Sequence, residues 1–145
     1  MTNSAAVATT PARVTDADVA KLKWLEGTWR GMDGDNPFFE RYRFEGTTML
    51  VDSFENETLE KVVDTSRFEL KNGTFETSNG DKRTVATSIT DNSVQFAPAV
   101  AGQGNSYRFE RQADGNWNAI LEWPATGNAP DRQKIYEMKR WPPAK

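Results

Sequence analysis

The chain of 145 residues contains neither cysteine nor histidine. Their absence excludes disulfides, thiolate and imidazole metal ligands, cysteine nucleophiles and every catalytic pair in which histidine activates serine or cysteine. Carboxylate-only sites for Mg²⁺ or Ca²⁺ are compatible with the composition, but we expect neither a metal ion nor an organic cofactor. Much ordinary enzyme chemistry is thereby excluded.

The sequence also lacks long apolar runs and a concentrated positive charge. No run approaches the roughly 20 apolar residues that span a bilayer. The formal net charge is -3, whereas nucleic-acid binding requires a basic face. Residues 1–15, rich in Ala, Thr and Ser, have neither the basic start nor the apolar core of a secretory signal. We expect a cytoplasmic protein with no membrane span and no nucleic-acid partner, in which residues 1–15 form a flexible tail.

What the chain does contain is many large rings. Aromatic residues make up 11% of it, with 5 Trp and 8 Phe, so a few large side chains must supply much of the apolar burial. A chain of this length buries roughly 68–70% of its unfolded surface, which is enough for one core without disulfides. The composition favours a single domain over residues 16–145.

Turn signals divide this domain into one helix and a series of strands. Residues 16–25 have apolar side chains at helical spacing, with Thr15 or Asp16 as the N-cap and Gly27 at the end. Apolar and polar residues then alternate between turn dipeptides such as Asp33-Gly34. The predicted strands are residues 28–31, 37–45, 48–56, 59–71, 74–78, 83–90, 93–97, 105–113, 116–123 and 133–141.

The spacing of these strands predicts an all-β, antiparallel, up-and-down barrel. No connection has room for a crossover helix, so neighbouring strands must run antiparallel. Rolling about ten such strands closed buries one apolar face and removes exposed edges. A sandwich would need long Greek-key connections, which only residues 97–105 and 124–132 could supply. A barrel of eight or more strands can hold one small ligand.

Several landmarks occur in a characteristic order. They are Trp24-Leu25-Glu26-Gly27-Thr28-Trp29-Arg30-Gly31, Phe39-Glu40-Arg41-Tyr42, Gly46-Thr47-Thr48-Met49-Leu50, Asn105-Ser106-Tyr107-Arg108-Phe109 and Asp114-Gly115-Asn116-Trp117. On these residues the chain resembles an uncharacterised family of bacterial lipocalin-like proteins, among the calycin-type β-barrels. The resemblance implies that Trp29 closes one barrel end and that Arg140, or else Lys139, packs across its ring. Haem binding of the nitrobindin kind does not carry over, because that activity uses a histidine.

Glu40 is the main candidate for chemistry because it lies between Phe38 and Tyr42 on the face predicted to point inward. A carboxylate there must be hydrogen-bonded, paired or protonated. It could orient a polar ligand group or transfer a proton, with Tyr42 as a donor, and Asp64 could meet it across the lumen. Alternatively, Glu40 pairs with an arginine or faces water after a register change, and Asp64 is a solvated group near the mouth.

Period-two alternation also predicts the rest of the lining. The predicted ligand-binding residues are Phe38, Glu40, Tyr42, Phe68, Phe96, Tyr107, Phe109, Trp117 and Trp123, and the candidate catalytic residues are Glu40, Tyr42 and Asp64. Trp29 and Arg140 are assigned a structural role. On the strand over residues 83–90, the same rule places Val85, Thr87 and Ile89 inward.

Three functions are compatible with this pattern. The first is binding of a small, mainly apolar or amphipathic organic molecule in the barrel cavity. The second is a cofactor-free isomerase, cyclase or lyase that uses a carboxylate-tyrosine pair in the same cavity. The third is a barrel filled by its own rings that serves an interaction role, with a homodimer as one form. A cavity would separate the first two from the third, and a buried Glu40 with a raised pKa would favour catalysis.

Overall fold

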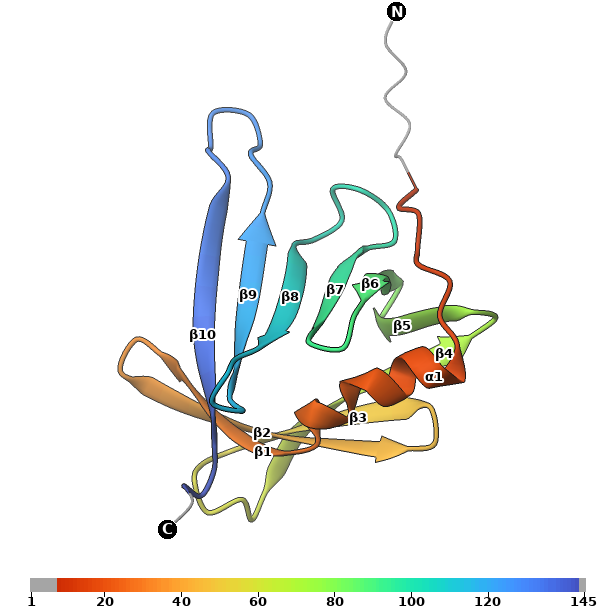
Figure 1. The fold of residues 1–145 in the computed structure, drawn as a ribbon. Coiled ribbons are helices and arrows are strands. Elements are labelled where there is room, and N and C mark those ends of the chain that lie inside the picture. Colours follow the sequence, from red (N-terminus) through yellow and green to blue (C-terminus); the bar gives the residue numbers. More distant parts are fainter. Residues whose placement is uncertain (1–7, 144–145) are drawn as a thin grey trace, which may run out of the picture.

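The computed structural model describes residues 8–143, which form a closed barrel of ten antiparallel strands preceded by a short helical segment (Figure 1). Each strand pairs with the next along the chain, and β1 pairs with β10. This confirms the predicted all-β, up-and-down architecture. The strands are β1 (Gly27–Asp33), β2 (Asn36–Glu45), β3 (Thr48–Phe54), β4 (Val62–Lys71), β5 (Thr74–Asn79), β6 (Lys82–Ile89), β7 (Ser93–Pro98), β8 (Ser106–Arg111), β9 (Trp117–Trp123) and β10 (Arg132–Arg140).

The helical segment before β1 changes type halfway. Residues 16–25 are predicted as one helix, whereas the structure has an α-helix, α1 (Asp16–Ala20), followed by a 3₁₀-helix, η1 (Lys21–Leu25). Residues three apart lie on the same side of a 3₁₀-helix, which places Leu22 and Leu25 together in the core. The segment lies across one end of the barrel, opposite the long β9–β10 hairpin (Figure 1).

Between Thr9 and α1 the chain is hydrogen-bonded to the barrel, within the segment 1–15 that the sequence predicts as a flexible tail. Residues 1–7 lie outside the described part of the chain. The Thr9 N–H donates to the Ala99 carbonyl oxygen at 2.8 Å, and the Val14 N–H donates to that of Gly73 at 2.7 Å. A stretch rich in Ala, Thr and Ser has no periodic pattern, so the sequence does not reveal that strand ends satisfy its backbone groups.

The seam between β1 and β10 is short and is covered by one stacked pair of side chains. Two residue pairs connect the strands, Trp29 with Arg140 and Arg30 with Lys139. The Arg140 guanidinium carbon lies 4.1 Å from the centroid of the Trp29 ring, and a cation–π contact of this kind contributes about 0.5–2 kcal/mol. Trp29 therefore closes the barrel against its last strand.

Aromatic side chains fill the half of the barrel that the helical segment covers. Phe68, Phe75 and Phe96 have ring centroids 5.1–6.2 Å apart and belong to one core cluster with the leucines of η1. Trp117, which has no exposed surface, packs edge-on against Trp29 with centroids 5.9 Å apart. This half of the interior is solid.

The inward face of β6 differs from the period-two prediction. Val85, Thr87 and Ile89 were expected to point inward, but Ala86 joins the core cluster in place of Val85. The pairing of β6 with β7 is irregular between Ala86 and Ser88, and this returns Ile89 to the core side. A β-bulge shifts the alternation by one residue. No residue type in this stretch indicates that a bulge occurs there.

Substituting Gly27 tests whether its missing side chain makes room for Arg140. Gly27 has a φ of +132°, and a Cβ atom there would overlap the Arg140 guanidinium. We expect Gly27→Ala to lower the free energy of unfolding by roughly 2–4 kcal/mol, through backbone strain and the displaced cation. In an Arg140→Ala background only the strain remains, so the same substitution should cost about 1 kcal/mol less. Urea denaturation of the four proteins measures both costs.

Gly80 provides the matched control for this cycle. Its φ is +66°, and a Cβ atom there would meet nothing within 4 Å. Gly80→Ala should therefore cost only the backbone strain, about 1–3 kcal/mol, and cost the same with and without Arg140. If Gly27→Ala also costs the same in both backgrounds, the steric role assigned to Gly27 is wrong.

Candidate functional site

The other half of the barrel interior contains a cavity of about 320 Å³. Side chains of β2, β8, β9 and β10 form its walls, and five of the ten lining residues are aromatic. The lining residues are Phe38, Glu40, Tyr42, Asn105, Tyr107, Phe109, Ala119, Leu121, Tyr136 and Met138. A concave apolar hollow with a few polar groups is the usual form of a small-molecule site.

Alternation along β2 positions three of the lining side chains. Phe38, Glu40 and Tyr42 share the inward face because successive side chains of a strand point to opposite sides. Phe38 meets Tyr136 of β10 edge-on, with centroids 5.2 Å apart. Gly31 of β1 permits this approach, since a Cβ atom there would overlap the Phe38 ring. Beyond the two paired positions of β1 and β10, the contact between Phe38 and Tyr136 therefore joins β2 to β10.

Trp117 forms the floor between the cavity and the solid half of the core. Its ring centroid lies 5.3 Å from that of Tyr42 and 4.9 Å from that of Phe109, and both of these residues line the cavity. These rings close the end of the cavity next to the solid half of the core. A polar side chain in the cavity, such as that of Glu40, is therefore shielded from water on this side.

Glu40 is the one carboxyl group among the lining residues. Burial raises its pKa from 4.5 to about 7, and the hydrogen bond that the Tyr42 hydroxyl donates to Oε1 at 3.3 Å opposes part of this rise. Near neutral pH the group is divided between its protonated and ionised forms. Burial, followed by the neighbouring Glu40 charge, raises the pKa of Tyr42 well above its usual value, so Tyr42 stays a hydrogen-bond donor.

The structure gives the arginines of β2 partners other than Glu40. Arg43 donates from Nε to Asp52 at 2.9 Å. Burial opposes ionisation of Asp52, but hydrogen bonds to its carboxylate, led by that from Arg43, outweigh burial and lower its pKa. The Arg41 guanidinium lies 4.7 Å from the centroid of the Phe54 ring. The interpretation in which Glu40 pairs with an arginine is therefore not what the structure shows.

Five of the predicted ligand-binding residues line the cavity together. They are Phe38, Glu40, Tyr42, Tyr107 and Phe109. Of the other four, Phe68 and Phe96 belong to the solid half and Trp117 forms the floor. Trp123 lies at the end of β9 and is not part of the lining; the Arg132 guanidinium covers its ring, 4.7 Å from the centroid.

Asp64 does not join Glu40 in the cavity. Its side chain is exposed, although Asp64 pairs in register with Ser53, which in turn pairs with Glu40. The reason is the pairing of β4 with β5, which begins only at Glu69. Among residues 8–143, no strand pairs with the first part of β4 on that side, and residues 62–67 are exposed. The expected meeting of two carboxylates is absent from the described cavity.

The predicted site omits five of the residues that line the cavity. They are Asn105, Ala119, Leu121, Tyr136 and Met138. Ala119 and Leu121 lie between the predicted residues Trp117 and Trp123 on the same face of β9. Met138 and Tyr136 lie two and four residues before Arg140 on β10, so all three side chains point to the same side of the strand. Extending the alternation backwards from Arg140 would have predicted both lining residues. Asn105 precedes β8 in a loop, where no periodic signal exists.

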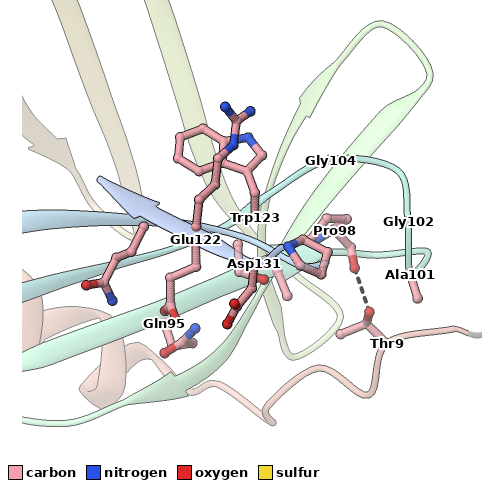
Figure 2. Close-up of a pocket in the computed structure, with 14 residues that line it drawn as sticks. Thr9, Gln95, Pro98, Ala101, Gly102, Gly104, Glu122, Trp123 and Asp131 are labelled. Carbon is pink, nitrogen blue, oxygen red and sulfur yellow. Dashed lines mark hydrogen bonds between the residues drawn. The ribbon is translucent and has the colours of Figure 1, made fainter. Parts of the chain in front are cut away.

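A larger hollow of about 650 Å³ lies outside the barrel beside the β7–β8 loop. Figure 2 shows Trp123 and Glu122 in its lining, and Thr9 donating through Oγ1 to the Pro98 carbonyl oxygen at 2.6 Å. Glu122 also accepts a hydrogen bond of 3.4 Å from Arg108. Its carboxylate is thus already paired, whereas a desolvated titratable group marks the interior cavity as the candidate site.

Comparison with known proteins found no family model, no curated protein and no solved structure that matches this chain. Across residues 8–143, no helix has both the length and the apolar character that a membrane crossing requires. In the part of the chain that the structure describes, no three acidic side chains are grouped as metal ligands would be. Fold and site together define a ten-stranded antiparallel β-barrel with an aromatic-lined interior hollow.

Replacing Glu40 with glutamine tests the electrostatics of the cavity. The pKa of Glu40 is higher in the folded than in the unfolded chain, so folding favours its protonated form, and stability is lost as the pH rises from 4.5 to about 7. Glu40→Gln removes this loss. We expect the variant to be more stable than the parent by roughly 1–3 kcal/mol at pH 8 and equally stable at pH 4. Urea denaturation at both pH values measures the difference.

An exposed glutamate provides the control for this comparison. Glu60 lies on the surface between β3 and β4, so Glu60→Gln should leave the pH dependence of stability unchanged. A Glu40→Gln variant that is less stable than the parent at pH 8 would show that the Glu40 carboxylate is held by a favourable partner in the folded chain. That result would contradict the assignment of a desolvated carboxyl group.

Proposed function

We propose that the barrel binds a small, mainly apolar organic molecule in its interior cavity, with Glu40 and Tyr42 holding the polar end of the ligand. The observation that supports this most strongly is the hollow itself, which combines aromatic walls with a single desolvated carboxyl group. Apolar walls supply affinity through burial, and a few polar groups fix orientation. The resemblance to lipocalin-like proteins, which rests on Gly27-Thr28-Trp29, agrees with this function.

The size of the cavity limits the ligand. Its volume of about 320 Å³ is near the lower end of the range for small-molecule sites. An apolar cavity of about 150 Å³ is large enough for benzene. A ligand of one or two rings, with a short polar substituent, would therefore fill the space.

Filling the cavity tests this function. Ala119 lines the hollow on β9 and is buried, so Ala119→Leu should occupy the ligand's volume and weaken binding of 2-phenylethanol at least about tenfold. Titration followed by the NMR signals of the Met138 methyl group, which also lies in the lining, measures the affinity. Ala113→Leu, in an exposed turn, is the control and should leave binding unchanged.

Native mass spectrometry of protein purified from the cells that make it extends the same test. A small molecule that accompanies the parent chain and the Ala113→Leu control, but not Ala119→Leu, would identify the occupant of the hollow. Equal binding of 2-phenylethanol by the parent and by Ala119→Leu would show that the ligand sits elsewhere. The proposed function would then be wrong.

A second candidate function is proton transfer within the same cavity. The specific observation in its favour is that Glu40, with a pKa of about 7, accepts a hydrogen bond from Tyr42 in an apolar surrounding. A general base works best when its pKa lies near the working pH. The ionised Glu40 could remove a proton from a bound carbon acid, after which the Tyr42 hydroxyl, no longer needed by the carboxylate, could donate to oxygen charge on the substrate.

The base-catalysed ring opening of 5-nitrobenzisoxazole probes this chemistry. Glu40 would take the proton on carbon 3, the ring N–O bond would break, and the electron pair would leave on the phenolate oxygen of a yellow product. We expect a rate about 100-fold above that of Glu40→Gln, rising with pH around a midpoint near 7. In Tyr42→Phe the midpoint should move upward, because the hydrogen bond that lowers the Glu40 pKa is lost. A rate that Glu40→Gln leaves unchanged would exclude Glu40 as the base.

A further inference from the structure

We propose that the cavity selects small organic amines in their protonated form, with the ammonium group beside Glu40 and the apolar body among the aromatic rings. The inference rests on the proposed function, since it assumes that the interior cavity is the binding site, and it names the chemical class of the ligand. Three observations carry it: the ring-rich walls, the unpaired carboxyl group, and the absence of a basic side chain from the described lining.

Aromatic rings surround the space beside Glu40 on several strands. Phe38 and Tyr42 come from β2 and Tyr107 from β8, whereas the ring of Tyr136 on β10 already contacts the Lys134 ammonium. The face of an aromatic ring attracts a cation within about 6 Å of its centroid, and cages of such rings recognise ammonium ligands. A phenol ring offers the same face together with a hydroxyl group that can accept a hydrogen bond from an ammonium. The walls thus suit a cation as well as an apolar body.

The carboxyl group of Glu40 has no cationic partner in the described structure. The described lining contains no lysine or arginine. Among residues 8–143, the Glu40 carboxyl group accepts one hydrogen bond, from the neutral Tyr42 hydroxyl. A carboxylate in an apolar site is stabilised strongly by an opposite charge within about 4–6 Å. A ligand ammonium would supply that charge, whereas a ligand carboxylate would face a like charge in a medium of low polarity.

Two basic side chains of β10 that share the alternation of Tyr136 and Met138 have other partners. Lys134 of β10 is exposed and donates to Asp33 at the end of β1, 2.5 Å away, and its ammonium lies 5.2 Å from the centroid of the Tyr136 ring. Arg140 packs over Trp29 and donates to the Glu26 carbonyl oxygen at 3.2 Å. Neither residue belongs to the cavity lining. The counter-charge for Glu40 is therefore left for the ligand to provide.

Binding of an amine should be linked to pH through Glu40. The titratable groups that face it are the phenols of Tyr42, Tyr107 and Tyr136, and burial raises the pKa of Tyr42 and of Tyr107 further from neutrality. The lining residues of β9 and the partner of Glu40 on β3, Ser53, carry no charge. A protonated amine requires the ionised form of Glu40, so amine affinity should fall as the pH drops below 7.

Three molecules of the same shape separate this inference from the broader function. They are 2-phenylethylamine, 2-phenylethanol and phenylacetate, which are a cation, a neutral molecule and an anion at pH 8. We expect the amine to bind the intact chain at least about tenfold more tightly than the alcohol, because a hydrogen bond between charged groups is the stronger one. Phenylacetate should bind more weakly than either. Calorimetric titration measures the three affinities.

The pH and two variants complete the experiment. Between pH 8 and pH 5.5 the amine affinity should fall roughly tenfold or more, while the alcohol affinity should change little. Glu40→Gln, expected to be a stable variant, should reduce the preference for the amine to within about threefold. Glu122→Gln, which removes one of the two carboxylates lining the larger hollow outside the barrel, Glu122 and Asp131, should leave that preference intact.

Each outcome separates the two proposals. Equal affinities of amine and alcohol, or an amine preference that persists in Glu40→Gln, would overturn the amine inference and leave the cavity as a binding site for neutral molecules. An amine preference lost in Glu122→Gln would place the cation in the larger hollow outside the barrel and overturn the inference as well. Failure of all three molecules to bind the intact chain would overturn the proposed function itself.

Discussion

The short seam between β1 and β10 is the constraint on which the rest of the structure depends. Two residue pairs close the barrel there, and Arg140 lies over Trp29 at that point. The strand pairing stops above the seam, and the Phe38 and Tyr136 side chains close the wall instead. Trp29 at the seam belongs to the solid half of the core, whereas Phe38 and Tyr136 line the hollow half.

The electrostatics of the site follow from this division. Trp117 belongs to the solid half and supports the rings of Tyr42 and Phe109 from below. Glu40 lies above them, in the hollow, so its carboxyl group is desolvated by rings and receives one neutral hydrogen bond. The same group on the outer face would resemble Asp52, whose pKa is lowered by its partners. The two faces of the sheet thus give a stabilised carboxylate at Asp52 on β3 and a desolvated one at Glu40 on β2.

Much of this arrangement could be predicted from sequence, because period-two alternation and turn dipeptides are local signals. They predicted the ten strands and placed Glu40 between Phe38 and Tyr42 on the inward face. The failures have non-local causes. The irregularity after Ala86 depends on the pairing with β7, and the exposure of Asp64 depends on where β5 begins to pair. No single-strand pattern contains either fact.

The lasting question is why a barrel of this kind contains Glu40 at all. A glutamine would fill the same volume, accept the same hydrogen bond from Tyr42 and avoid the cost of a desolvated charge. The raised pKa of Glu40 indicates that the glutamate costs stability at neutral pH, and the described lining offers it a neutral hydrogen bond from Tyr42 but no cation. Features that lower stability are typical of sites where function requires them. A bound cation, or a proton taken from a substrate, would offset the cost of the charge. Both proposed activities of the cavity require a carboxylate, whereas a glutamine would serve a purely structural role equally well.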